Sequence, residues 1–147
     1  MISIREEANI RRGKVMSDVD WISILGWGQD ELEDLRLVGY SYIRQGKYDI
    51  ATTFFEALVV LTPHSLYDLQ TLGALYLQKG NNLMALNYIE KALKIDPTHA
   101  PTLLNRTKVL FALGYKKQAL AQAQALEKNP EADIAGQAQA LIMAYSS

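Results

Sequence analysis

The chain has 147 residues, a length that suits one compact domain. Fifteen Lys and Arg residues against sixteen Asp and Glu residues give a formal charge of −1, so no overall field draws the protein to nucleic acid or to a membrane. Charged residues at 21% and apolar residues at 49% are typical of a packed globular chain and argue against a disordered one.

Residues 1–31 are predicted to form a leader and one short apolar helix ahead of the main fold. Both tryptophans of the chain lie here, and Gly26 and Gly28 are expected to end the helix. Two interpretations stay open: the helix caps the first repeat described below, or it is an arm that joins two copies of the chain. The candidates for a dimer contact are Val19, Trp21, Ile22, Leu25 and Trp27.

A shift of 34 residues aligns the sequence with itself, which indicates tandem repeats. Three sets of identical residues coincide: Leu35, Leu69 and Leu103; Gly46, Gly80 and Gly114; and Ala51, Ala85 and Ala119. We therefore place three repeats at residues 32–65, 66–99 and 100–133, within one unit that spans residues 32–133.

Each repeat is predicted to contain two helices joined by a tight turn. In the first repeat, apolar residues recur at helical spacing from Leu35 to Tyr42, and Gly46 can adopt the left-handed conformation that closes a helix. The second helix is expected to begin near Tyr48 and to end before Pro63, which cannot continue it. Small residues recur where helices would approach each other closely: Gly39, Gly73, Ala51, Ala85 and Ala119.

Residues 134–147 continue with one more apolar helical face. Its members are Ile134, Ala138, Leu141, Ile142 and Tyr145. A terminal helix of this kind covers the last repeat of an array, because each repeat can bury its apolar face only against a neighbour. We expect residues 134–147 to be a capping helix.

The 34-residue helix–turn–helix pattern resembles the tetratricopeptide repeat from Leu32 to about Asp133. Leucine stands at the usual tryptophan position of the family, and the third repeat carries Arg106 and Thr107 where Leu and Gly are expected. The resemblance implies an all-α fold. It would be a right-handed α-solenoid of three tandem repeats, with an N-terminal helix and a C-terminal capping helix.

The resemblance also implies a concave groove, lined by the first helices of successive repeats. The residues that fall on the groove stripe are Arg36, Tyr40, Ile43, Arg44, Tyr67, Gln70, Ala74, Leu77, Leu104, Lys108 and Phe111. This stripe is largely apolar, and an apolar stripe left over after the core is filled usually marks a binding site. We expect it to hold apolar anchors of an extended peptide. The alternative is that Ile43, Leu77 and Phe111 extend the core.

The sequence offers little for catalysis or for metal binding. The chain has no cysteine, and its two histidines, His64 and His99, follow prolines in equivalent loops. Two such distant histidines make a poor zinc site. We therefore expect no enzyme activity, no metal and no cofactor. Basic residues without interleaved aromatics do not favour nucleic acid, and no apolar run is long enough to insert into a membrane.

The first repeat is also similar to that of one group within the repeat family. Residues 30–35, the segment Gln45–Tyr48 and residues 55–61 are similar to the first repeat of the class II chaperones of bacterial type III secretion. This resemblance implies a cytoplasmic protein that holds an apolar segment of a secreted translocator in its groove, as a homodimer or a chaperone heterodimer. A general tetratricopeptide adaptor and a needle-subunit type of chaperone, which binds a client helix, stay open as alternatives.

Overall fold

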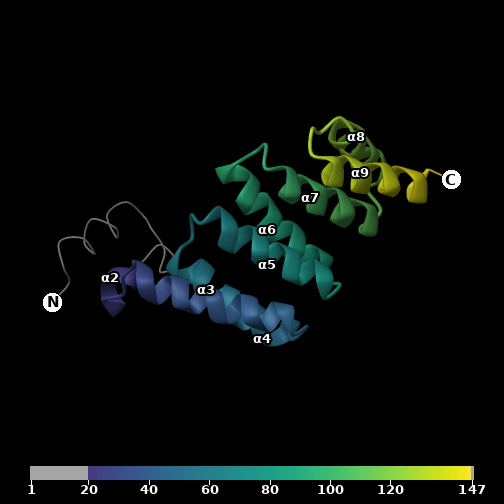
Figure 1. Cartoon of the computed structure of the whole chain (residues 1–147). Coiled ribbons are helices and arrows are strands. Elements are labelled where there is room, and N and C mark those ends of the chain that lie inside the picture. Colours follow the sequence, from purple (N-terminus) through teal and green to yellow (C-terminus); the bar gives the residue numbers. More distant parts are fainter. Residues whose placement is uncertain (1–19, 147) are drawn as a thin grey trace.

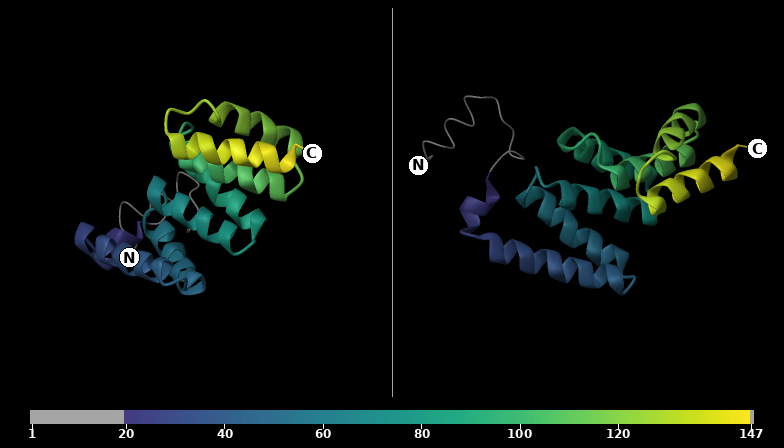
Figure 2. Two further views of the ribbon diagram at one scale, coloured as in Figure 1. Left: turned by 45° about the vertical axis from the view of Figure 1, so that its right-hand side comes forward. Right: turned by 45° about the horizontal axis from the view of Figure 1, so that its top comes forward.

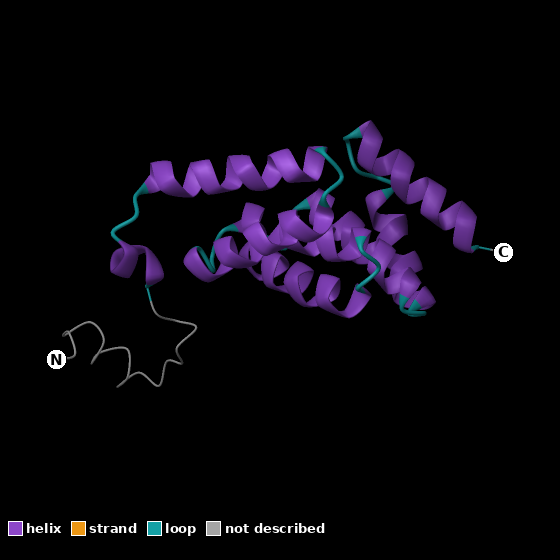
Figure 3. Cartoon of the chain, turned by 90° about the horizontal axis from the view of Figure 1, so that it is seen from below, coloured by secondary structure: helices purple, strands orange, loops and turns teal. Residues whose placement is uncertain are grey.

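The computed structural model describes residues 20–146, and within this range the chain forms helices and loops but no strand (Figure 3). None of these helices is long and apolar enough to span a bilayer. They are α2 (Trp21–Leu25), α3 (Gln29–Arg44), α4 (Tyr48–Leu61), α5 (Leu66–Gln78), α6 (Asn82–Ile95), α7 (Ala100–Ala112), α8 (Lys116–Leu126) and α9 (Ala132–Tyr145).

Three helical hairpins, α3–α4, α5–α6 and α7–α8, follow one another along a solenoid (Figure 1). Each hairpin is turned relative to its neighbour, as the two views of Figure 2 show. Helix α2 lies at the N-terminal end and α9 lies against the last hairpin at the other end. The predicted all-α fold of three tandem helix–turn–helix repeats with a helix at either end is confirmed.

Glycine closes the first helix of each hairpin, as the sequence predicts. Gly46, Gly80 and Gly114 have φ angles of 73°, 79° and 89°. A residue with a Cβ is strained in this left-handed region. The N–H group of each glycine donates to a carbonyl of the helix that it ends, for example from Gly80 to the Leu77 carbonyl at 3.0 Å. The three turns are therefore alike because the backbone requires glycine there.

The two helices of the first and second hairpins touch at a second glycine. A Cβ built on Gly39 would lie 2.8 Å from the ring of Phe55, and one on Gly73 would lie 3.0 Å from the Ile89 side chain. Both Phe55 and Ile89 are buried in one apolar cluster. The predicted close approach at these glycines is confirmed, and it leaves room for a large side chain on the partner helix.

The third hairpin reaches the same packing with a different pair of residues. Thr107 stands at the position of Gly39 and Gly73, and Ala123 stands at that of Phe55 and Ile89. Both are fully buried, and the Thr107 hydroxyl donates to the Leu103 carbonyl at 2.9 Å. The larger residue on α7 is thus matched by a smaller one on α8.

The first prediction concerns the turn glycines. Gly80→Ala should lower the free energy of unfolding by about 1 kcal/mol, because it places a Cβ in the left-handed region. Gly136→Ala is the matched control: Gly136 is exposed within α9, and a Cβ there would meet nothing within 4 Å. This control should raise stability by about 0.5 kcal/mol through helix propensity. Urea denaturation measures both, and equal effects of the two changes would contradict the assigned turn.

Candidate functional site: the groove between α3 and α5

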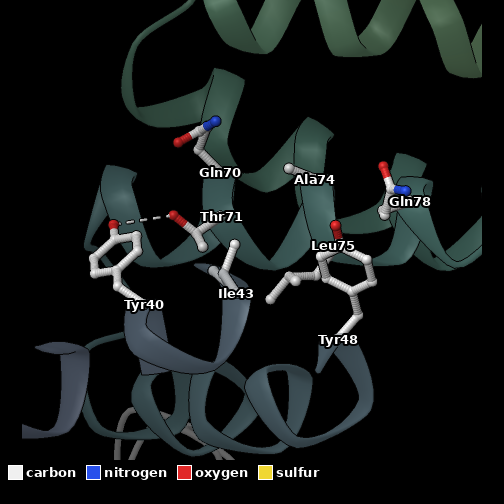
Figure 4. A pocket seen from close by; sticks show the side chains of 8 residues that line it. All are labelled: Tyr40, Ile43, Tyr48, Gln70, Thr71, Ala74, Leu75 and Gln78. Carbon is white, nitrogen blue, oxygen red and sulfur yellow. Dashed lines mark hydrogen bonds between the residues drawn. The ribbon is translucent and has the colours of Figure 1, made fainter. Parts of the chain in front are cut away.

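An open groove of about 410 Å³ lies between α3 and α5, next to the start of α4 (Figure 4). Its lining residues are uncharged: Tyr40, Ile43, Tyr48, Gln70, Thr71, Ala74, Leu75 and Gln78. No group of three or more His, Cys, Asp or Glu side chains that could hold a metal occurs in residues 20–146. The groove can therefore contact a ligand through apolar surface and neutral hydrogen-bonding groups.

Two rows of side chains border the groove. Gln70, Ala74 and Gln78 succeed one another at four-residue steps on one face of α5, and Figure 4 shows them along one edge. Tyr40 and Ile43 lie on the opposite side, on α3. Because residues four apart share a helix face, the α5 row runs lengthwise along that helix. The groove is consequently elongated.

Tyr40 is held in place by two contacts. Its ring meets the Phe55 ring edge to face, with centroids 5.2 Å apart, and its hydroxyl lies 3.3 Å from the Thr71 hydroxyl on α5. The side chain is still 38% exposed. A tyrosine in this position can offer an ordered apolar edge to a ligand at low cost in conformational entropy.

Arg36 does not present a free charge to the groove. Its guanidinium donates to both carboxylate oxygens of Asp68 on α5, at 2.8 and 2.7 Å, and Asp68 is fully buried. The Thr62 hydroxyl also donates to Asp68, at 2.6 Å. The hydrogen bond to Asp68 raises the pKa of the Arg36 guanidinium, although burial opposes the shift. Arg36 thus links the first two hairpins.

Of the remaining predicted residues of the first two repeats, Ile43 lines this groove, whereas Arg44, Tyr67 and Leu77 are not among its lining residues. Tyr67 is 67% exposed at the start of α5, and Arg44 is exposed at the end of α3. Ile43 and Leu77 are half-buried and pack against the main apolar cluster. The alternative that these two residues extend the core is therefore correct in part, although Ile43 also lines the groove.

The expectation for the third repeat is wrong, because α9 covers its stripe. Leu104 and Phe111 are only 4% and 6% exposed. Leu104 packs with residues of α8 and α9, and the Phe111 ring stacks on Tyr145 with centroids 4.1 Å apart. Lys108 donates to the Gln137 side chain of α9 at 3.1 Å. These three residues belong to the contact with the capping helix.

Sequence reasoning missed four lining residues, Tyr48, Thr71, Leu75 and Gln78. Gln78 could have been found, because it continues the four-residue steps from Gln70 through Ala74. Tyr48 carries no such signal, since it belongs to the second helix of its hairpin and reaches the groove from the turn.

The dimer candidates divide between two environments. Val19 lies outside the described residues. Ile22 and Trp27 pack against the main apolar cluster, and Trp21 is half-buried. Leu25 is 49% exposed beside Ile24 at 54%. Helix α2 therefore covers part of the first hairpin with one side and leaves two apolar residues uncovered.

Comparison with known proteins assigns the family. The sequence profile of the family described as anaphase-promoting complex, cyclosome, subunit 3 matches residues 44–127. The chain belongs to this tetratricopeptide repeat family. Tetratricopeptide repeat protein 6 of Homo sapiens is 32% identical over 98 residues, which make up 66% of this chain and 19% of that protein. The chain spans a fifth or less of the length of the curated relatives it matches.

Two solved structures share the fold over most of the chain. A T3SS complex from Aeromonas hydrophila has a chain with a TM-score of 0.78 and 22% identity, covering 97% of this chain and 95% of that one. PcrH of Pseudomonas aeruginosa, in complex with the chaperone binding region of PopD, has a TM-score of 0.69 and 25% identity, covering 81% of this chain and 93% of that one.

The second prediction tests the Arg36–Asp68 link. In a double-mutant cycle, Arg36→Ala and Asp68→Ala should show a coupling of about 2 kcal/mol in unfolding free energy, because either single change leaves a partly desolvated charge without its partner. The surface pair Lys79–Asp49, 2.9 Å apart with Asp49 90% exposed, is the control. Its coupling should be too small to resolve. Equal couplings for the two pairs would show that burial of Asp68 adds nothing.

Proposed function

We propose that the groove between α3 and α5 binds an extended, apolar segment of a client protein and that the chain acts without catalysis. The observation that carries this proposal is the lining: aliphatic and aromatic side chains with a few neutral polar groups, and no charged residue. Such a surface gains binding energy by burying apolar area and offers nothing to select a charged ligand.

Within this class, we propose a chaperone of bacterial type III secretion that acts in the cytoplasm on a translocator. Two observations support this choice. The first repeat resembles that of the class II chaperones, and the fold is shared with PcrH, a protein solved with the chaperone binding region of PopD. A general tetratricopeptide adaptor would use the same groove for a client that is not secreted. The identity of the client therefore distinguishes the two.

The third prediction tests the groove. Overlapping peptides that cover both the secreted and the other proteins of the native host should include apolar segments of secreted proteins that bind the wild type. Tyr40→Ala combined with Tyr48→Ala, both at lining positions, should weaken this binding at least about 100-fold, since anchor residues cost about 2 kcal/mol each. Affinity should change little between low and high salt, because the groove is neutral.

The control for this prediction is Tyr115→Ala. Tyr115 is 53% exposed at the start of α8, and it does not line the groove. This variant should bind like the wild type. If the double variant folds, as judged by its melting temperature, and still binds at full strength, the groove is not the binding surface. Clients drawn only from proteins that are not secreted would favour the adaptor.

We propose in addition that the uncovered side of α2 mediates self-association. Ile24 and Leu25 are exposed, whereas Ile22 and Trp27 of the same region pack inward. The fourth prediction is that Ile24→Ser with Leu25→Ser converts a dimer to a monomer in sedimentation experiments and leaves helix content unchanged. A wild-type chain that sediments as a monomer at micromolar concentration would leave α2 with the capping role alone.

A further inference from the structure

We propose that Gln70 and Gln78 grip the main chain of the client at two points about four residues apart. The client segment would then lie lengthwise along α5, extended and uncharged, with one apolar side chain over Ala74. This inference rests on the proposed function and deepens it, because it specifies the kind of client segment that the groove binds.

The two glutamine amides are available for such contacts. Both line the groove, and neither makes a side-chain hydrogen bond within residues 20–146. Gln70 is half-buried and Gln78 is exposed, so their polar groups meet solvent at the groove edge (Figure 4). A primary amide can accept from a peptide N–H and donate to a peptide C=O together. Each glutamine can therefore replace solvent at one residue of an extended main chain.

The spacing of the glutamines matches an extended chain. Eight residues along a helix separate their Cα atoms by about 12 Å. An extended peptide rises about 3.3 Å per residue, so the same distance covers about four residues. Ala74 lies midway between the glutamines, and it lines the open space of the groove together with Leu75 and Ile43. The central residue of the segment, two positions from each grip, points its side chain into this space.

The charges around the groove select against an acidic or basic segment. No lining residue is charged, and the Arg36 guanidinium is neutralised by buried Asp68 at 2.7 Å. A client charge placed here would lose hydration without gaining a partner. The main-chain grip is independent of side-chain identity, so the segment is chosen by its extended shape and its central apolar residue.

The test uses N-acetylated, C-amidated octapeptides built from Ala, Ser, Thr and Gln with one Leu, Ile, Met or Phe at the fourth position. The tightest binder is then N-methylated at one main-chain nitrogen at a time. Wild-type protein should lose about fivefold in affinity or more at two nitrogens about four positions apart, since each loses one hydrogen bond. Gln70→Ala should abolish the loss of affinity caused by methylation at one of these nitrogens. Gln78→Ala should abolish the loss caused by methylation at the other.

Two further variants separate the grip from the groove itself. Gln139→Ala, at an exposed position of α9, should leave both sensitivities in place. Ala74→Leu fills the central space and should weaken binding at least tenfold. One outcome is that the glutamine variants keep the wild-type dependence on N-methylation while Ala74→Leu weakens binding. In that case the proposed main-chain contacts are wrong, and binding in the groove is supported. If no octapeptide binds the wild type, or if Ala74→Leu has no effect, both the grip and the proposed function are overturned.

Discussion

The groove lies between α3 and α5, and the buried Arg36–Asp68 ion pair joins these two helices. Both guanidinium bonds are short and nearly equal, so the pair fixes the orientation of one helix against the other as well as their distance. Asp68 also accepts from Thr62, which follows α4. One buried carboxylate therefore ties together α3, the end of α4 and α5, and Tyr40 sits one turn further along α3 at the groove edge.

This ion pair occurs once, and its absence from the next junction explains the chemistry of the groove. A shift of 34 residues replaces Arg36 by Gln70 and Asp68 by Thr102. Thr102 is fully buried and meets His99 Nδ1 at 2.7 Å, so it offers nothing that engages Gln70. The Gln70 amide consequently keeps its hydrogen-bonding capacity. The same repeat position thus joins two hairpins in one place and lines the groove in the other.

Most of the fold could be predicted from the sequence because the same residue recurs at equivalent positions wherever the backbone has the same structural requirement. Gly46, Gly80 and Gly114 all mark a left-handed turn, and all three have positive φ. The third repeat departs from the family at Thr107, yet its partner Ala123 is smaller in compensation. This pairing could have been predicted from the sequence. The summed volume of the two side chains differs less from that in the other repeats than the volume of either side chain does.

The extent of the groove could not be predicted in the same way. The prediction assigns equivalent positions on every first helix to the groove, which treats all three repeats alike. The last repeat differs because α9 packs against it where a further hairpin would otherwise follow. Leu104 is apolar where the equivalent residue of the second repeat is Gln70, and this difference was the available signal of burial.

Because α9 covers the stripe of the third repeat, the groove is lined by residues of the first two hairpins. In the proposed mode of binding, a groove of this length contacts few client side chains, so main-chain contacts supply much of the affinity. That balance is consistent with the proposed role, in which the groove holds an extended client segment without requiring one particular sequence.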